Sequence, residues 1–262
     1  MGSRAAVSTG KVRCNMLRPR PFLIALQFLT ALPIQLQDRP TEADVGRSLL
    51  HYPLVGLLMG TVLTVMGWGL TAAPSLVGAA IVLTLWVLMT GMLHLDGLAD
   101  SADAWLGGLG DRDRTLAIMK DPRCGPAAVI ALILLLLLKF AALVELMAGE
   151  QWLALALIPM LGRSALLLLF LSTPYVRPGG LGALLATHLP RRGALAVLLS
   201  SAALVLALMG LAGVGLIALL VLTFFLLRRL MQRRIGGTTG DTAGAMVEIT
   251  ETILLLGWVV VT

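Results

Sequence analysis

The run AVIALILLLLLKFAALVELMA, residues 128–148, limits what this chain can fold into more than any other feature. About 20 apolar residues in a helix are needed to cross the roughly 30 Å hydrocarbon layer of a membrane. Similar runs recur along the 262 residues, of which 58% are hydrophobic and 13% charged. The alternating pattern of a membrane β-barrel is missing. The sequence therefore predicts an all-α fold, a polytopic bundle of transmembrane helices.

Seven spans are expected from the apolar runs, at 48–70, 76–95, 126–148, 151–171, 193–209, 213–230 and 246–262. Residues 193–227 would form a helix of about 52 Å, too long for one crossing. We therefore expect a turn near Gly210. The segment PFLIALQFLTALPI is too short to span, so a short interfacial or re-entrant helix is expected there. Residues 1–20 are predicted to be a disordered extension, and 21–262 a single integral membrane domain.

Basic residues indicate the orientation of the chain. Cytoplasmic loops carry the excess of Lys and Arg. The expected outer turns, near 71–75, 149–150 and 210–213, contain neither residue. We therefore place the amino end in the cytoplasm and read most of the net charge of +6 as this topology signal. No basic stripe with interleaved aromatic residues predicts nucleic-acid binding.

Carboxylates concentrate in two segments, 94–125 and 235–251, which both face the cytoplasm in this topology. These segments hold nine of the fourteen acidic residues, namely Asp96, Asp100, Asp103, Asp111, Asp113, Asp121, Asp241, Glu248 and Glu251. A solvated helix end or loop is the plain alternative to a functional role, and for Asp111 and Asp113 it is the better one. For the others, the concentration favours a binding site.

The stretch HLDGLADSADAWLGG places Asp96, Asp100 and Asp103 at steps of four and three residues. On a helix these steps stack side chains on one face, where like charges repel. A cation should offset that repulsion, and Mg²⁺ prefers oxygen ligands from carboxylates, phosphates and water. Asp241 and Glu248, seven residues apart, would form a second acidic face. The sequence therefore predicts a Mg²⁺ site.

Cations near these carboxylates suggest a phosphate-bearing ligand. Lys120 and Arg123 bracket Asp121, and they could clamp a polyphosphate or serve only as membrane anchors. Arg163 lies within a span and could reach a cytoplasmic cavity, because ionisable groups inside membranes usually face the bundle interior. Lys139 lies deeper, where a structural pair with Glu145 is expected. His94 could serve packing as well as ligation.

Mg²⁺, polyphosphate and membrane together point to phosphoryl or phosphodiester transfer, in which the protein positions groups and neutralises charge. The chain has no G-x-x-x-x-G-K-[ST] loop, which argues against an ATPase.

Four blocks resemble one known family. HLDGLADSADAWLGG, IMKDPRCGPAAV, YVRPGGLG and GGTTGDTAGAMVEITE are similar to the cobalamin synthase family, the adenosylcobinamide-GDP ribazoletransferases. The likeness extends from Pro21 to Leu255. It implies a catalytic membrane domain in the bacterial inner membrane, with its site facing the cytoplasm. The implied reaction joins adenosylcobinamide-GDP to α-ribazole or its 5′-phosphate, gives adenosylcobalamin or its 5′-phosphate, and releases GMP with Mg²⁺ as cofactor.

The resemblance also implies residue roles. Metal binding would fall to Asp96, Asp100 and Asp103, and these three with Asp241 and Glu248 would form the catalytic carboxylates. The substrate-binding residues would be Lys120, Asp121, Arg123 and Arg177. Arg163 is added to this set because of its position inside a span, not because of the resemblance. The base, the number of ions and the preferred nucleoside stay open. So does whether the chain forms a homo-oligomer or assembles with other enzymes of the cobalamin pathway.

Two rival readings remain. CDP-alcohol phosphotransferases of lipid synthesis also use D-G-x-x-A and cytoplasmic aspartates, but here Ala99 is followed by Asp100 instead of Arg. A cation-coupled transporter would carry its charges near the bilayer midplane. The carboxylates of this chain gather at cytoplasmic ends instead, which favours an enzyme.

Overall fold

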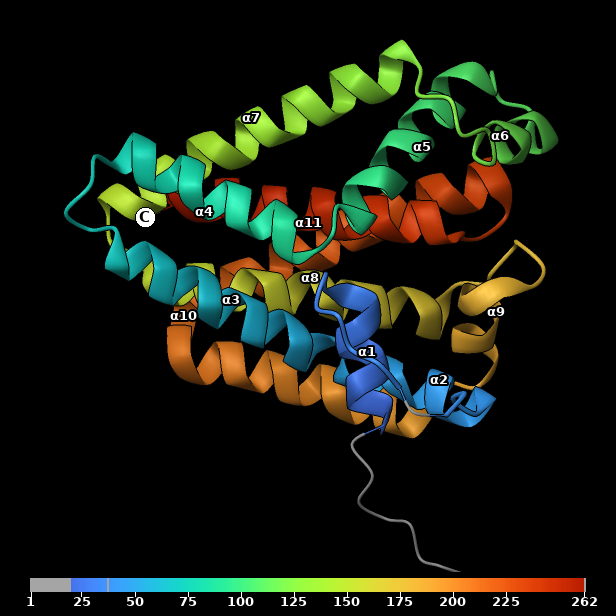
Figure 1. Cartoon of the computed structure of the whole chain (residues 1–262), viewed down its shortest axis with the longest axis horizontal. Helices are drawn as coiled ribbons and strands as arrows, with labels where there is room; N and C mark the ends of the chain where they lie inside the picture. The colour runs from blue at the N-terminus through green and yellow to red at the C-terminus, as the bar shows by residue number, and fades with distance from the viewer. Residues whose placement is uncertain (1–19, 37, 262) are drawn as a thin grey trace, which may run out of the picture.

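The computed structural model describes residues 20–36 and 38–261, and this part of the chain is built from helices (Figure 1). They are α1 (Arg20–Leu29), α2 (Glu42–Ser48), the 3-10 turn η1 (Leu49–His51), α3 (Tyr52–Gly69), α4 (Ser75–Met89), α5 (Leu93–Gly107), α6 (Arg112–Ile118), α7 (Pro126–Ala148), α8 (Trp152–Ser172), α9 (Gly180–Thr187), α10 (Arg191–Ile235) and α11 (Gly240–Val261). Among the described residues no strand forms, and one isolated bridge joins Tyr175 to Thr238. The all-α prediction is confirmed.

In the part of the chain that the structure describes, five helical segments are long and apolar enough to cross a membrane: α2 to α3 as one, α7, α8, α10 and α11. The helices α4 and α5, which are bent against each other, are together also long and apolar enough, and they would make a sixth span. The chain is therefore a polytopic helical membrane protein, as predicted.

The helix α10 breaks at Gly210, whose φ of 55° and ψ of −129° are not helical. Glycine adopts this backbone conformation without a steric penalty. Arg191 and Arg228 lie near the two ends of α10, yet both donate to backbone carbonyls at the end of α8. Arg191 donates to Leu171 at 3.2 Å, and Arg228 donates to Ser172 at 2.7 Å. A straight helix would separate these arginines by about 55 Å. The chain thus turns back at Gly210 (Figure 1), and the expected split is confirmed.

The expected span 76–95 is wrong at its end. The helix α4 stops at Met89, and α5 leaves it at an angle of 86°. Gly91 and Met92 at the bend have positive φ values of 57° and 62°, and the Thr90 hydroxyl donates back to the Val87 carbonyl at 2.9 Å. The bend gives the three aspartates a helix of their own, directed across the bundle.

The amino-terminal helix α1 has ten residues and packs beside α2. The prediction of a short helix here is confirmed, and the predicted disordered extension lies almost wholly outside the described residues. A capping box starts α2: Asp44 N–H donates to the Thr41 hydroxyl at 3.1 Å, and the Asp44 side chain accepts from Thr41 N–H.

The helix α8 is the centre of the bundle. Of its apolar 18-residue stretch 83% is buried, against 28% for α7 and 22% for α10. Its closest neighbour is α3, where a methyl group on Gly56 or Gly60 would collide with the backbone of Pro159 or Ala156. Two glycines four residues apart let membrane helices touch backbone to backbone. The exposed leucines and isoleucines of α7 and α10 are left to face lipid.

Candidate active site

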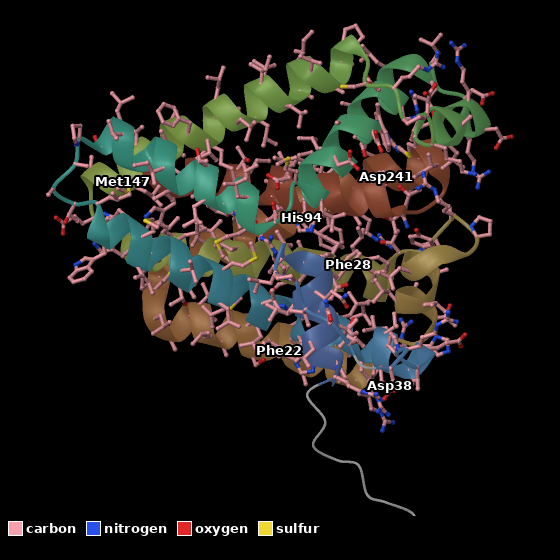
Figure 2. All side chains as sticks on the ribbon, viewed as in Figure 1. Phe22, Phe28, Asp38, His94, Met147 and Asp241 are labelled. Atoms are coloured by element: carbon pink, nitrogen blue, oxygen red, sulfur yellow. The ribbon has the colours of Figure 1, made fainter. Side chains whose placement is uncertain are left out.

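The helices α5 and α11 cross at two glycines. A Cβ on Gly97 would lie 2.7 Å from the carbonyl oxygen of Asp241, and one on Gly244 would lie 3.2 Å from the Cα of His94. Only glycine allows this approach. The glycine of the D-G pair therefore brings the aspartates of α5 beside the first turn of α11 (Figure 2).

The start of α11 is fixed by a second capping box. Thr239 N–H donates to the Thr242 hydroxyl at 2.8 Å, and Thr242 N–H donates to the Thr239 hydroxyl at 3.3 Å. Asp241 thus falls in the first helical turn, where the helix dipole favours a negative side chain. The expected second acidic segment, 235–251, is mostly this helix.

Arg177 reaches Asp241 from the loop that connects α8 and α9. Its Nη2 donates to Asp241 Oδ2 at 2.8 Å. The loop is held by Val176 N–H donating to the Thr238 carbonyl and Thr238 N–H donating to the Pro174 carbonyl, both at 2.9 Å. Asp100 lies within electrostatic reach of Asp96, Asp103, Asp241 and Arg177. Four carboxylates and one guanidinium, from three parts of the chain, therefore act on one another electrostatically here.

Two pockets adjoin Asp96. The larger, about 410 Å³, is lined by acidic residues of α5, by Arg123 and by apolar side chains of α4 and α7. The smaller, about 140 Å³, is lined by Asp96 and Asp241 together with His94 and a set of aromatic and aliphatic side chains. Asp96 therefore stands where two separate ligands could meet.

Asp103 also lines the larger pocket, but its oxygens have backbone partners. Oδ2 accepts from Gly125 N–H at 2.6 Å and Oδ1 accepts from Ala128 N–H at 2.9 Å. These are donors at the start of α7, so Asp103 caps that helix from α5. Its predicted role as a metal ligand has no support in this arrangement, which uses the carboxylate to join two helices.

The block after the acidic motif forms an exposed loop. Arg123 donates through Nε and Nη2 to both oxygens of Asp121, at 2.9 and 2.5 Å for the nearest contacts. This fork lowers the pKa of Asp121 to about 2, so the pair stays ionised at neutral pH. Lys120 is exposed beside it. Arg123 lines the larger pocket, whereas Lys120 lines neither pocket.

The positions expected for Arg163 and Glu248 are corrected by the structure. Lys139 Nζ lies 2.9 Å from an oxygen of Glu248 and 2.9 Å from one of Glu251, and Arg163 binds the other oxygen of Glu251. All four side chains are at most 4% exposed. Two cations and two carboxylates thus neutralise one another inside the bundle. Neither Arg163 nor Glu248 lines either pocket.

The expected pair of Lys139 with Glu145 is also wrong. Glu145 lies near the carboxyl end of α7 and lines a different pocket, together with Gly149. The ammonium group of Lys139 instead lies 4.2 Å from the ring centre of Trp86, with the carboxylates of α11 around it. Buried charges need close partners because the interior solvates them poorly.

The residues present fit a Mg²⁺ ion with few protein ligands. In the described part of the chain, no three carboxylate, imidazole or thiol groups are close enough together to hold a metal by themselves. Asp96 is exposed and Asp100 half-buried, and neither carboxylate has a hydrogen-bond partner among the described residues. Mg²⁺ commonly takes one or two carboxylates, with phosphate and water as its other ligands. Asp96 and Asp100 are such a pair.

Comparison with known proteins decides the family. The family model described as cobalamin-5-phosphate synthase matches residues 21–259. The chain belongs to this family. The resemblance found in the sequence is thus confirmed over nearly its full extent.

Curated relatives in this family share one name, adenosylcobinamide-GDP ribazoletransferase. One from Pseudomonas fluorescens (strain Pf-5) is 59% identical over 237 residues, which cover 90% of this chain and 98% of that protein. Another from Pseudomonas putida (strain W619) is 59% identical, and the match covers 90% of this chain and 97% of that protein. A third from Stutzerimonas stutzeri (strain A1501) is 58% identical, and the match covers 90% of this chain and 96% of that protein. No solved structure matches the chain.

Sequence reasoning missed the smaller pocket. Its walls come from α1, α3, α8 and α9, which supply Phe28, Tyr52, Phe170 and Leu185. These positions are far apart in the chain and carry no motif, so no local signal could have gathered them. For His94 the sequence left packing and ligation open, and the structure places its side chain in the lining of this pocket.

Proposed function

We propose that this chain is an adenosylcobinamide-GDP ribazoletransferase. It joins adenosylcobinamide-GDP to α-ribazole, or to its 5′-phosphate, gives adenosylcobalamin or its 5′-phosphate, and releases GMP. The observation that carries this is the identity of 59% with the Pseudomonas fluorescens enzyme of that name over 98% of its length. The meeting of Asp96, Asp100 and Asp241 at the α5–α11 crossing supports it, because the reaction needs charge control at phosphorus.

The chemistry is a displacement at phosphorus. A ribazole hydroxyl oxygen forms a bond to the phosphorus that carries cobinamide, and the bond from that phosphorus to the bridging oxygen breaks. The bridging oxygen leaves with GMP, and the hydroxyl proton passes to a carboxylate. In our proposal Asp241 accepts this proton, because it lines the smaller pocket with one oxygen held by Arg177.

Asp96 and Asp100 would hold Mg²⁺, and Arg123 would contact the diphosphate from the rim of the larger pocket. When bound, Mg²⁺ would neutralise the diphosphate and stabilise the departing phosphate. The two hydrogen bonds to Asp121 fix the orientation of the Arg123 guanidinium and leave its Nη1 to donate to a phosphate oxygen. Lys120 would add positive charge nearby. We place the site on the cytoplasmic side of the inner membrane, where the basic loops are expected.

The test uses purified protein held in a bilayer disc with adenosylcobinamide-GDP and α-ribazole. We expect GMP release and cobalamin formation together, and only with Mg²⁺. Asp96→Asn and Asp100→Asn should each slow transfer by about 100-fold or more, the size seen when one preorganised charge contact at a transition state is removed.

The matched control is Asp113→Asn, since Asp113 is 91% exposed on α6 and outside both pockets. It should keep full activity. A fully active Asp96→Asn protein would remove Asp96 from the scheme. Folded wild-type protein that forms neither product would contradict the proposed function and return attention to lipid-transferase or transporter roles.

A further inference from the structure

His94 is a buried polar side chain that the fold itself does not use. It is 3% exposed, and neither ring nitrogen has a hydrogen-bond partner among the described residues. Buried polar atoms are nearly always paired, because water no longer solvates them. The imidazole lines the smaller pocket next to Asp96 and Asp241. A ligand in that pocket would therefore find a hydrogen-bonding group already in place.

The pocket has aromatic walls. Phe28 of α1 stacks on Tyr52 of α3, with ring centres 6.2 Å apart and planes at 24°. Phe170 of α8 lines another side and is itself stacked on Tyr175 at 6.1 Å. Leu166 and Leu185 complete an apolar surface. Such walls suit a flat aromatic ring, which gains from both burial and stacking. Figure 2 shows Phe28, His94 and Asp241 around the same part of the bundle.

We propose that this pocket binds the benzimidazole base of the ribazole substrate, with a His94 N–H donating to the one free ring nitrogen of that base. The inference rests on the proposed function and adds to it the place and the recognition of the second substrate. The ribose would then lie toward Asp96 and Asp241, which line the same pocket. The cobinamide diphosphate would occupy the larger pocket, on the other side of Asp96.

Polar matching favours benzimidazole over the guanine of the other substrate. Guanine presents several donors and acceptors along one edge, whereas a dimethylbenzimidazole nucleoside presents one acceptor nitrogen and apolar edges. Besides the two carboxylates that we assign to metal and proton transfer, the polar side chains that line the pocket are His94 and Tyr52, and the Tyr52 hydroxyl already has Ser48 as a hydrogen-bond partner. A neutral imidazole supplies the single donor needed. A corrin ring is far too large for about 140 Å³.

The experiment compares α-ribazole with the same nucleoside built on 5,6-dimethylindole, in which C–H replaces the acceptor nitrogen. Wild-type protein in bilayer discs should show a KM about tenfold lower for α-ribazole, the worth of one net hydrogen bond. His94→Phe keeps a flat ring but removes the donor. It should raise the KM for α-ribazole about tenfold, leave the KM for the indole nucleoside at its wild-type value, and leave inhibition by GMP unchanged.

His188→Phe is the matched control, because His188 is half-buried at the carboxyl end of α9, lies 3.4 Å from Glu42 and does not line the pocket. It should leave both KM values and GMP inhibition as in wild type. If His94→Phe instead weakens inhibition by GMP and spares the KM for α-ribazole, guanosine occupies the pocket and the proposal is wrong.

Equal KM values for the two nucleosides in wild-type protein would also overturn it, and that measurement does not depend on any variant folding. Wild-type protein that makes no cobalamin at all would mean failure of the proposed function, a separate result from failure of this subsite.

Discussion

Identical residues in one motif have different surroundings. Asp96 and Asp100 have oxygens without protein partners in the described structure, whereas both oxygens of Asp103 accept backbone N–H groups of α7. A helix cap of this kind fixes where the next helix starts. The residue scale therefore separates a structural aspartate from two that are available to a ligand.

We predict that Asp103→Ala lowers the stability of the folded protein by about 1 kcal/mol, the usual cost of losing a side-chain cap. The midpoint of unfolding in mixtures of SDS and mild detergent measures it. Asp100→Ala is the control and should leave the midpoint near the wild-type value, since it caps nothing. Equal midpoints for Asp103→Ala and wild type would show that the two backbone contacts contribute little.

At the scale of the helices, one bend and one close crossing position the acidic residues. The bend between α4 and α5 turns the acidic helix toward α11, and Gly97 lets the two backbones touch. The sequence predicts that this glycine lies on the same helix as the aspartates, but it does not show what the glycine contacts. In the folded chain it is a contact residue, and its missing side chain sets the distance between Asp96 and Asp241.

We predict that Gly97→Ala separates these helices and lowers transfer activity at least tenfold, because the new methyl group would lie 2.7 Å from the Asp241 carbonyl oxygen. Overpacking of this kind costs about 1–3 kcal/mol. Gly215→Ala on α10 is the matched control, with no atom within 4 Å of its added Cβ. Steady-state transfer rates and unfolding midpoints should change for the first variant only. Wild-type activity in Gly97→Ala would contradict the tight crossing.

At the scale of the whole molecule, the site lies at one end of the bundle, with α6 and α9 near it and the α3–α4 and α7–α8 turns at the other end (Figure 1). The two halves of α10 and the outer face of α7 expose large apolar side chains along the length between these ends. Such a surface fits lipid. With lipid along this surface, the acidic pocket would open to water at one end of the bundle.

We predict that this side is the cytoplasm. Cys124 is exposed in the loop that lines the larger pocket, so it reports on the site directly. In a Cys14→Ser background, a membrane-impermeant maleimide should label Cys124 in inside-out vesicles and leave it unlabelled in intact spheroplasts. Labelling in spheroplasts would invert the topology, and the Cys124→Ser protein serves as the blank.

The sequence by itself determined the class of fold, most of the helices and the family. Apolar runs specify membrane helices because lipid forces every backbone group to bond within its own segment. Spacing also predicted that Asp96, Asp100 and Asp103 lie on one helix, since neighbours on a helix face follow from its period, and α5 carries all three. The break of α10 followed from its length.

The tertiary structure alone decided which charges pair and which remain free. Lys139 binds Glu248 and Glu251, more than a hundred residues away, and so removes Glu248 from the acidic face. The pocket around His94 likewise joins six helices that share no motif. The local spacing of residues does not predict such contacts. Burial and the choice of charge partner depend on how the helices pack, and packing is a property of the whole bundle.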